Sequence, residues 1–166
     1  GIRDDLVTGV QTCALPISYR PCVGIFLIND DKKIFGGRRI DSRAEAWQMP
    51  QGGIDPGESA VEACMREMGE EIGTSAAEFL REHDDWLYYD IPLPLADRLW
   101  DGRFKGQKQK WMALRFTGED NDIDINTAIP EFCEWRWLAP NDLVNLAVPL
   151  KRDVYADVLS SFRDFI

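Results

Sequence analysis

Three glutamates in a short, helix-like segment are the residues of this chain best suited to chemistry. On a helical wheel, Glu67, Glu70 and Glu71 fall on one side, with the small Ala63 one turn before them. Like charges at this spacing repel, which destabilises an isolated helix by a few tenths of a kcal/mol per pair. A bound cation would remove that penalty. The pattern indicates a metal site or a solvated acidic face, and taken alone it favours the solvated face.

The segment before this helix is predicted to be a tight turn because it combines glycine with proline: Gly52, Gly53, Pro56 and Gly57. Either Glu58 or Ser59 can cap the helix, which should run from Ser59 to Ile72. Glycine lets an ion approach main-chain carbonyl oxygens closely, and carbonyl and carboxylate oxygens suit Mg²⁺ or Mn²⁺. A zinc site built on histidine is excluded, because His83 is the only histidine in the chain.

The length of 166 residues suits one domain, which we expect to span residues 19–166. Residues 1–18 show no sustained hydrophobic period, and their VTGVQTCALPIS portion resembles the conceptual translation of a sequencing adapter. We therefore expect an artefactual or disordered leader over 1–18 and exclude it from fold reasoning. No run of 18 or more apolar residues occurs, so the sequence predicts no membrane span.

The net charge of the chain is −10 at pH 7. This charge argues against nonspecific binding of nucleic acid, duplex DNA included, and suggests that metal ions and a few local cations neutralise any bound phosphate. Beyond the leader, Cys22, Cys64 and Cys133 are widely spaced and match no metal or redox motif. We expect buried, reduced thiols in a cytoplasmic protein, and a monomer.

Hydrophobic patterning predicts a sheet with few helices. Strands are expected at Cys22–Ile28, Lys33–Ile40, Phe79–Asp90, Gln107–Thr117 and Phe132–Leu138. A terminal helix is expected over Lys151–Phe165, and Asn141 or Asp142 can cap a short helix before it. The core-facing stripe of the acidic helix should consist of Val61, Cys64, Met65, Met68 and Ile72. Together these elements fit an α/β fold.

Three groups of residues near the glycine-rich turn have more than one interpretation. Arg38 and Arg39 close the second strand and could form a surface pair or hold a phosphate. Lys108 and Lys110 share one side of the 107–117 strand, which indicates equally an edge strand kept soluble by lysine or a row of cations facing phosphate. Trp47 could stack on a base, but a core position is favoured for so large a ring.

The spacing from Gly52 to Thr74 resembles the signature of the Nudix hydrolases: Gly52, five residues, Glu58, seven residues, then REMGEEIGT from Arg66. The last position of that pattern is usually aliphatic and is Thr74 here. The resemblance implies the Nudix fold, a mixed central β-sheet sandwiched between α-helices. Five segments are similar to bacterial RNA 5′-pyrophosphohydrolases and dinucleoside polyphosphate hydrolases: YRPCVGI, WQMPQGGIDPGES, GQKQKW, PEFCEWRW and VPLKRDVY.

The resemblance also implies roles for individual residues. Two or more Mg²⁺ ions, or Mn²⁺, would be held by the carbonyl of Gly52 and the carboxylates of Glu67, Glu70, Glu71 and Glu131. Glu58 and Arg66 would brace the motif. The phosphates or the nucleotide would be surrounded by Arg20, Arg39, Gln107, Lys108, Lys110 and Lys151.

These residues predict metal-dependent hydrolysis of a phosphoanhydride without a covalent intermediate. Glu71, Glu70 or Glu131 could remove the proton from the attacking water. The resemblance implies release of pyrophosphate from the 5′ triphosphate end of RNA. One alternative is a dinucleoside polyphosphate hydrolase, such as a diadenosine tetraphosphate hydrolase. An alternative of another class is an inert nucleotide-binding regulatory module, although such a module has no need of mutually repelling glutamates.

Overall fold

A computed structural model describes residues 18–41, 45–92, 95 and 102–166. All but the last residue of the predicted leader lies outside the described residues, and that last residue, Ser18, begins the first strand. The strands are β1 (Ser18–Ile28), β2 (Ile34–Arg39), β3 (Trp47–Gln48), β4 (Gln51–Gly53), β5 (Ala77–Glu82), β6 (Leu87–Asp90), β7 (Phe104–Phe116) and β8 (Phe132–Leu138). The helices are α1 (Ala60–Ile72), α3 (Pro140–Asn145) and α4 (Pro149–Ser161), with short 3₁₀ turns η3 (Asp120–Asp122) and η4 (Arg163–Phe165).

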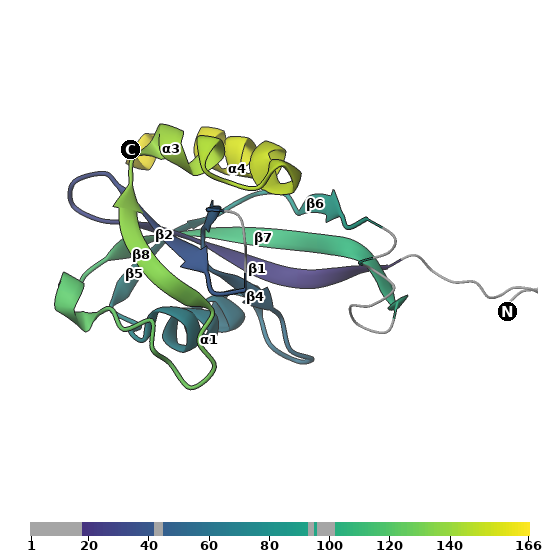
Figure 1. Ribbon diagram of the computed structural model, residues 1–166, viewed down its shortest axis with the longest axis horizontal. Helices are drawn as coiled ribbons and strands as arrows, with labels where there is room; N and C mark the ends of the chain where they lie inside the picture. The colour runs from purple at the N-terminus through teal and green to yellow at the C-terminus, as the bar shows by residue number, and fades with distance from the viewer. Residues whose placement is uncertain (1–17, 42–44, 93–94, 96–101) are drawn as a thin grey trace, which may run out of the picture.

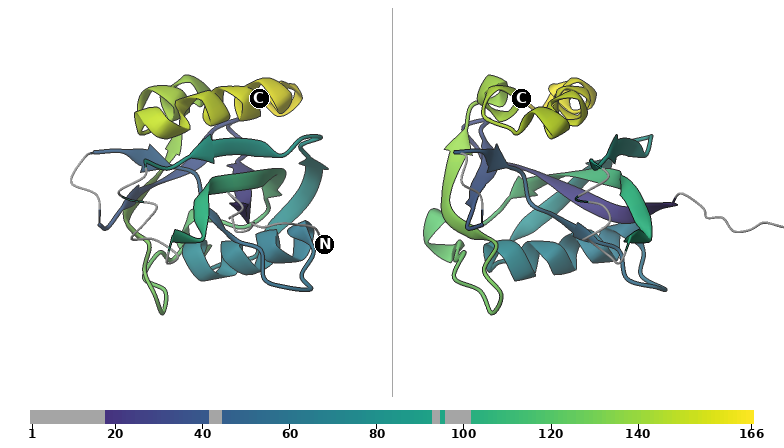
Figure 2. Two further views of the ribbon diagram at one scale, coloured as in Figure 1. Left: turned by 90° about the vertical axis from the view of Figure 1, so that its right-hand side faces the viewer. Right: turned by 45° about the vertical axis from the view of Figure 1, so that its right-hand side comes forward.

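The strands form one mixed sheet around the long parallel pair β1–β7. The main order is β3-β2-β1-β7-β5, while β4 pairs with β1, β6 with β7 and β8 with β2, all antiparallel. Helix α1 lies on one side of the sheet, and α3 and α4 lie on the other (Figures 1 and 2). The predicted α/β sandwich, with its mixed central sheet, is therefore confirmed.

Alternation along β1 supplies both halves of the core. Val23, Ile25 and Leu27 belong to a cluster that includes α1, whereas Phe26 and Ile28 belong to a cluster that includes α3 and α4. Such a strand is buried on both faces and reads as a continuous apolar run, as the sequence predicts.

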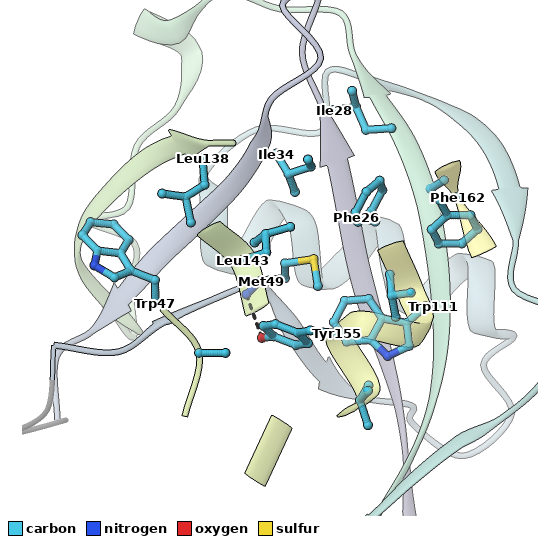
Figure 3. Close-up of a cluster of buried hydrophobic side chains, with 14 of the residues drawn as sticks. Phe26, Ile28, Ile34, Trp47, Met49, Trp111, Leu138, Leu143, Tyr155 and Phe162 are labelled. Carbon is cyan, nitrogen blue, oxygen red and sulfur yellow. Dashed lines mark hydrogen bonds between the residues drawn. The ribbon is translucent and has the colours of Figure 1, made fainter. Parts of the chain in front are cut away.

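The cluster beneath α4 fixes the entry to the glycine-rich turn (Figure 3). The buried Tyr155 hydroxyl of α4 accepts a hydrogen bond from the backbone N–H of Met49 at 2.9 Å. Trp47 is buried in the same cluster, which confirms its predicted core position, and Arg136 stacks over its ring. Helix α4 thus holds the chain immediately before β4.

Helix α1 begins and ends where its sequence signals predict. Ser59 is the N-cap: its side chain accepts from the Glu62 N–H, and the Glu62 side chain accepts from the Ser59 N–H. Gly73 ends the helix in the left-handed conformation, with φ 79°. One prediction is wrong: Val61 is 38% exposed, and the buried face of α1 includes Ala63 and Glu67 instead.

Two predictions about strands are corrected. The segment Phe79–Asp90 is not one strand, since the chain turns between β5 and β6, where the His83 imidazole accepts a hydrogen bond from the Asp85 N–H at 3.0 Å. Strand β7 is not an edge strand, because β1, β5 and β6 all pair with it. Its lysines therefore do not serve to keep an open edge soluble.

Two smaller predictions are also corrected. Neither Asn141 nor Asp142 caps α3; Ala139 occupies the N-cap position and Pro140 follows at the first helical position, where proline is well tolerated. Cys22 and Cys64 are buried free thiols, but Cys133 is exposed. Among the described residues, no helix is both long and apolar enough to cross a membrane.

Candidate active site

Four glutamates from two distant parts of the chain line one pocket of about 790 Å³. Glu67, Glu70 and Glu71 come from α1, and Glu131 comes from the segment that enters β8. Pairing of β8 with β2 delivers Glu131, since Ile40 donates its backbone N–H to the Glu131 carbonyl at 3.0 Å. The structure therefore brings together all four carboxylates that the resemblance assigns to a metal.

The Glu67 carboxylate is buried without full compensation. The residue is 8% exposed, and its Oε2 atom lacks a hydrogen-bond partner among the described residues. Arg66 lies 3.4 Å from the other oxygen, Oε1. Burial, together with the charge of Glu70, raises the pKa of Glu67 to about 7. Gly52, whose carbonyl the resemblance assigns to the metal, lies against this carboxylate, and a Cβ at position 52 would overlap it.

Glu71 is the most strongly perturbed of the four glutamates. Burial raises its pKa to about 9, and the nearby Glu67 and Glu131 add to the shift. Its Oε1 accepts the backbone N–H of Gln51 at 3.3 Å. The ionised form of Glu71 is therefore poorly stabilised here, and without a cation its carboxyl group keeps its proton at neutral pH.

The carboxylate oxygens of this pocket fit a divalent metal ion. Carboxylate oxygens are hard ligands of the kind that Mg²⁺ and Mn²⁺ prefer, and a buried, unpartnered carboxylate oxygen is stabilised by a cation. Within the described ranges, no three acidic, cysteine or histidine side chains form a metal cage by themselves. Arg66 pairs with both Glu67 and Glu70 in this arrangement.

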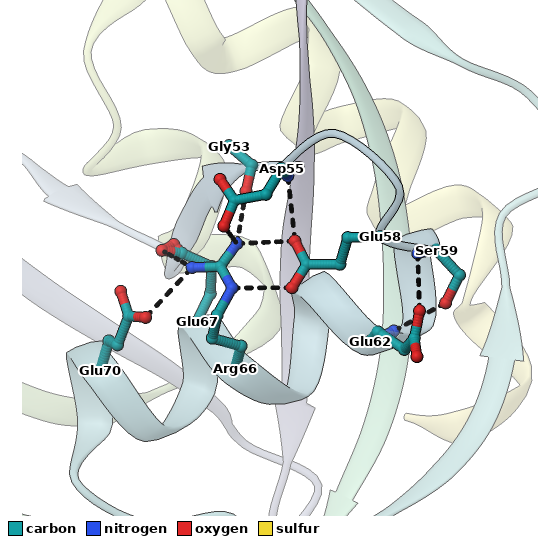
Figure 4. Close-up of polar contacts among 8 residues, drawn as sticks. All are labelled: Gly53, Asp55, Glu58, Ser59, Glu62, Arg66, Glu67 and Glu70. Atoms are coloured by element: carbon teal, nitrogen blue, oxygen red, sulfur yellow. Dashed lines mark hydrogen bonds and ion pairs between the residues drawn. The ribbon is translucent and has the colours of Figure 1, made fainter.

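Arg66 joins the glycine-rich turn to α1 (Figure 4). Its Nε and Nη2 atoms donate to the two oxygens of Glu58 at 2.8 and 2.9 Å, and Nη2 also donates to the Gly53 carbonyl at 2.8 Å. Its Nη1 atom donates to Glu70 at 3.1 Å. The Arg66 hydrogen bonds, with the Asp55 N–H, lower the pKa of Glu58 to about 2. This is the contact expected of two residues that brace the motif.

Two cations stand near the carboxylates. Arg39 places Nη1 3.9 Å from Glu131 and also pairs with Asp41 at the end of β2. Lys151 is buried on α4, and its pKa is lowered to about 8 by burial and by the charge of Arg39, against the opposing effects of Glu71 and Glu131. Positive and negative groups thus meet at the same end of the sheet.

The remaining predicted substrate-binding residues divide into two sets. Arg20 lies against Gly53, where its guanidinium would overlap a Cβ, and Gln107 contacts Gln51 of β4. Lys108 and Lys110 are not brought to this group. Lys108 packs on the Trp86 ring at 4.8 Å, and Lys110 bonds the Asp84 carbonyl at 3.0 Å, because alternation along β7 directs them away from Gln107.

Sequence reasoning did not single out three amides beside the site: Gln48 and Gln109, which are buried, and Gln51, which is half-buried. Gln48 and Gln51 accept hydrogen bonds from the Lys151 ammonium at 3.1 and 3.3 Å, and Gln109 donates to Gln51 at 3.0 Å. The alternation of Gln and Lys in GQKQKW is a signal that could have found Gln109, since it places Gln107 and Gln109 on one face. Thr127, on the far wall of the pocket, carries no such signal.

The mixed sheet between helices, with a glycine-rich turn feeding an acidic helix, is the architecture expected of Nudix hydrolases. A family model described as NUDIX domain matches residues 18–158, so the chain belongs to the Nudix family. A protein of Rickettsia bellii named RNA pyrophosphohydrolase is 51% identical over 159 residues, which cover 96% of this chain and 98% of that protein. A Roseobacter denitrificans protein of the same name is 51% identical over 158 residues, covering 94% and 98%. The chain is therefore, more narrowly, a Nudix pyrophosphohydrolase.

Solved structures share the fold at much lower sequence identity. The E. coli dihydroneopterin triphosphate pyrophosphohydrolase aligns with a TM-score of 0.64 and 18% identity, over 84% of this chain and 95% of that one. A C. elegans Ap4A hydrolase binary complex aligns with a TM-score of 0.60 and 17% identity, over 87% and 99%. At these identities the likeness establishes the fold alone.

Proposed function

We propose that this protein uses a divalent metal to remove pyrophosphate from the 5′ triphosphate end of RNA. The observation that carries this proposal is the pocket that gathers Glu67, Glu70, Glu71 and Glu131, in which Glu67 Oε2 is buried without a partner among the described residues. The near-full-length relatives named RNA pyrophosphohydrolase, about half identical to this chain, support RNA as the substrate.

The glutamates would hold two or more divalent ions, either Mg²⁺ or Mn²⁺. Bound metal supplies neutralisation of the polyphosphate charge and acidification of the attacking water. Gly52 leaves the space that the Glu67 carboxylate occupies, and Arg66 keeps the turn and the helix in register. Three carboxylates are candidates to take up the water proton: Glu70, Glu71 and Glu131.

The phosphate oxygens of a substrate need hydrogen-bond donors on the side of the pocket away from α1. We infer that Arg39 and Lys151 provide them. Both lie close enough to Glu71 and Glu131 for the charges of these glutamates to act on the pKa of each cation. Gln107 and Arg20 extend this set along β7 and β1. Lys108 and Lys110 stay candidates only for RNA that continues past the pocket.

We also infer that the protein acts in the cytoplasm as a monomer. Free thiols at Cys22, Cys64 and Cys133 are compatible with a reducing compartment. The net charge of −10 supports selective recognition of an RNA end over nonspecific binding to duplex DNA.

The test compares kcat/KM, in Mg²⁺, for a short RNA with a 5′ triphosphate and for diadenosine tetraphosphate. We expect RNA to be preferred by at least about tenfold, and Glu71→Gln to abolish turnover. Glu78→Gln is the matched control, since Glu78 pairs with Arg115 away from the pocket. Preference for the dinucleotide would overturn the RNA assignment in favour of a dinucleoside polyphosphate hydrolase. Binding without turnover of either substrate would indicate an inert nucleotide-binding module.

A further inference from the structure

Hydrogen-bonded amides link β4 to β7 through Gln51, Gln107 and Gln109, and the Lys151 ammonium of α4 bonds to the Gln51 end. Gln109, which is 1% exposed, sits at the centre of this amide chain. Its Nε2 atom donates to Gln51 Oε1 at 3.0 Å and to Gln107 Oε1 at 3.1 Å. A buried amide costs free energy unless its hydrogen bonds are made, and an apolar residue at position 109 would avoid that cost. The position of Gln109 therefore calls for a role beyond packing.

The direction of these hydrogen bonds is set by groups that can only donate. The buried Trp111 indole donates its Nε1–H to Gln109 Oε1 at 3.1 Å. An indole nitrogen has no acceptor function, so Gln109 must turn its oxygen toward Trp111 and its NH₂ group toward Gln51 and Gln107. At the other end the Lys151 ammonium, also a pure donor, points at Gln51 Oε1. Trp111 and Lys151 therefore favour one consistent orientation, in which Gln109 donates its NH₂ group to Gln51 Oε1.

Gln51 and Gln107 depend on Gln109 to different degrees. Gln51 has Lys151 as a second donor, which keeps its oxygen in place without Gln109. Gln107 Oε1 is approached by Gln109, by the Tyr89 hydroxyl at 2.7 Å and, at a longer 3.4 Å, by Gln51. A hydroxyl can donate or accept, so Tyr89 would tolerate a reversed Gln107 amide. Of the two amide donors to Gln107 Oε1, Gln109 makes the shorter hydrogen bond, 3.1 Å against 3.4 Å from Gln51, so Gln109 is the main group that fixes which end of Gln107 faces the network.

We propose that Gln109, oriented by Trp111, is a positioning residue that holds the Gln107 amide with its NH₂ group toward the phosphates of the substrate. Unprotonated phosphate oxygens only accept hydrogen bonds, so a reversed amide would present its oxygen to them and repel them. This proposal rests on the polyphosphate substrate of the proposed function. Gln109 itself acts through Gln107 and does not touch the substrate.

A double-mutant cycle measures this coupling without relying on RNA turnover. The affinity for inorganic triphosphate is titrated calorimetrically in Mg²⁺ for the wild type, Gln109→Leu, Gln107→Leu and the double variant, with phosphate release followed in the same samples. Gln109→Leu should weaken binding about fivefold in the wild type and less than about twofold in the Gln107→Leu background. Trp111→Phe, which removes the N–H but keeps an aromatic ring, should weaken binding in the same direction.

A control separates positioning from loss of stability. His83 is buried and bonds Asp157 of α4 at 2.8 Å, outside the amide chain. His83→Gln should lower the melting temperature and leave triphosphate affinity within about twofold of wild type. An equal loss of affinity from Gln109→Leu in both backgrounds, or no loss in either, would overturn the proposal. If the cycle shows coupling but RNA is not hydrolysed, the positioning role stands and the RNA assignment fails.

Discussion

The Glu67 carboxylate lies directly against Gly52, in the space that a side chain at position 52 would occupy. Glycine is therefore required there by the proximity of a charged group and not by backbone conformation, since Gly52 does not have a positive φ. The Glu67 atom nearest to a Cβ at position 52 would be Oε2, which has no hydrogen-bond partner in the part of the chain that the structure describes. The contact between Gly52 and Glu67 joins the two halves of the motif at the point where a metal would bind.

Gly52→Ala should displace Glu67 and damage the proposed metal site. A shift of about 1 Å in a catalytic group can cost about 100-fold in rate, so we expect a loss of that order in kcat/KM and a higher Mg²⁺ concentration for half-maximal activity. Steady-state kinetics across a Mg²⁺ series measures both. Wild-type Mg²⁺ dependence in Gly52→Ala would contradict this role.

The matched glycine is Gly69 on α1, where an added Cβ would meet nothing within 4 Å. Gly69→Ala should raise the free energy of unfolding by about 0.5–1 kcal/mol, because alanine loses less conformational entropy in a helix. Chemical denaturation measures the change. A loss of stability would contradict the open space beside Gly69.

Arg66→Lys should disconnect the turn from the helix although the charge is kept. A lysine ammonium cannot hold both Glu58 oxygens and the Gly53 carbonyl in the planar geometry that Arg66 uses. We expect the free energy of unfolding to fall by about 1–2 kcal/mol and kcat/KM to fall about tenfold. Arg115→Lys is the control, since its exposed pair with Glu78 should contribute under about 0.5 kcal/mol. Equal effects of the two substitutions would refute the bracing role.

The metal-free protein should become less stable as pH rises from 5 to 9. Folding raises the pKa of Glu67 to about 7 and that of Glu71 to about 9. At a pH between the unfolded-state pKa of each glutamate and its raised pKa, the folded state binds more protons than the unfolded state. Stability then falls with increasing pH. Melting in EDTA should show a drop of at least ~5 °C over this range.

Two comparisons isolate the carboxylates in that experiment. The lowered pKa of Lys151 acts in the opposite direction, adding stability as pH rises through about 8, so the wild type must be compared with Glu71→Gln at each pH. The variant should lose most of the downward slope, and added Mg²⁺ should raise the wild-type melting temperature most at high pH. A slope unchanged by Glu71→Gln would rule out Glu71 as its source.

Lys151→Met should separate stability from substrate affinity. The ammonium is buried among neutral amides, so a methionine of similar length should raise the melting temperature at pH 7, where Lys151 is still charged. Loss of a charge-assisted hydrogen bond to phosphate should raise KM about 10–100-fold. Lys33→Met, at an exposed turn, should change neither quantity. A stabilised variant with unchanged KM would remove Lys151 from the substrate site.

The parts of the fold set by local patterns could be predicted from sequence. Helix α1 with its Ser59 cap and Gly73 end, the buried run in β1 and the whole of β8 follow from short-range periodicity and end signals. The break between β5 and β6 could not be predicted, because it depends on the His83 side chain bonding its own turn and α4.

Local spacing predicts the part of the candidate site that one element carries, because Glu67, Glu70 and Glu71 share a helix. Glu131 reaches the pocket through the pairing of β8 with β2, and only the resemblance to Nudix hydrolases predicted it. The amides around Gln109 come from strands far apart in sequence, the Lys151 ammonium comes from α4, and alternation alone does not say what each face of β7 meets. For the same reason Lys108 and Lys110 could not be separated from the phosphate-facing candidates.

The measurement closest to the central claim is calorimetric binding of Mn²⁺, at pH 7.5, in buffers with different ionisation enthalpies. Two or more ions should bind to the wild type, and binding should release protons, because Glu71, and Glu67 in part, are protonated without metal. Glu71→Gln should bind fewer ions and release fewer protons, while Glu78→Gln should match the wild type. Wild-type binding by Glu71→Gln, or no saturable binding at all, would contradict a metal site on α1.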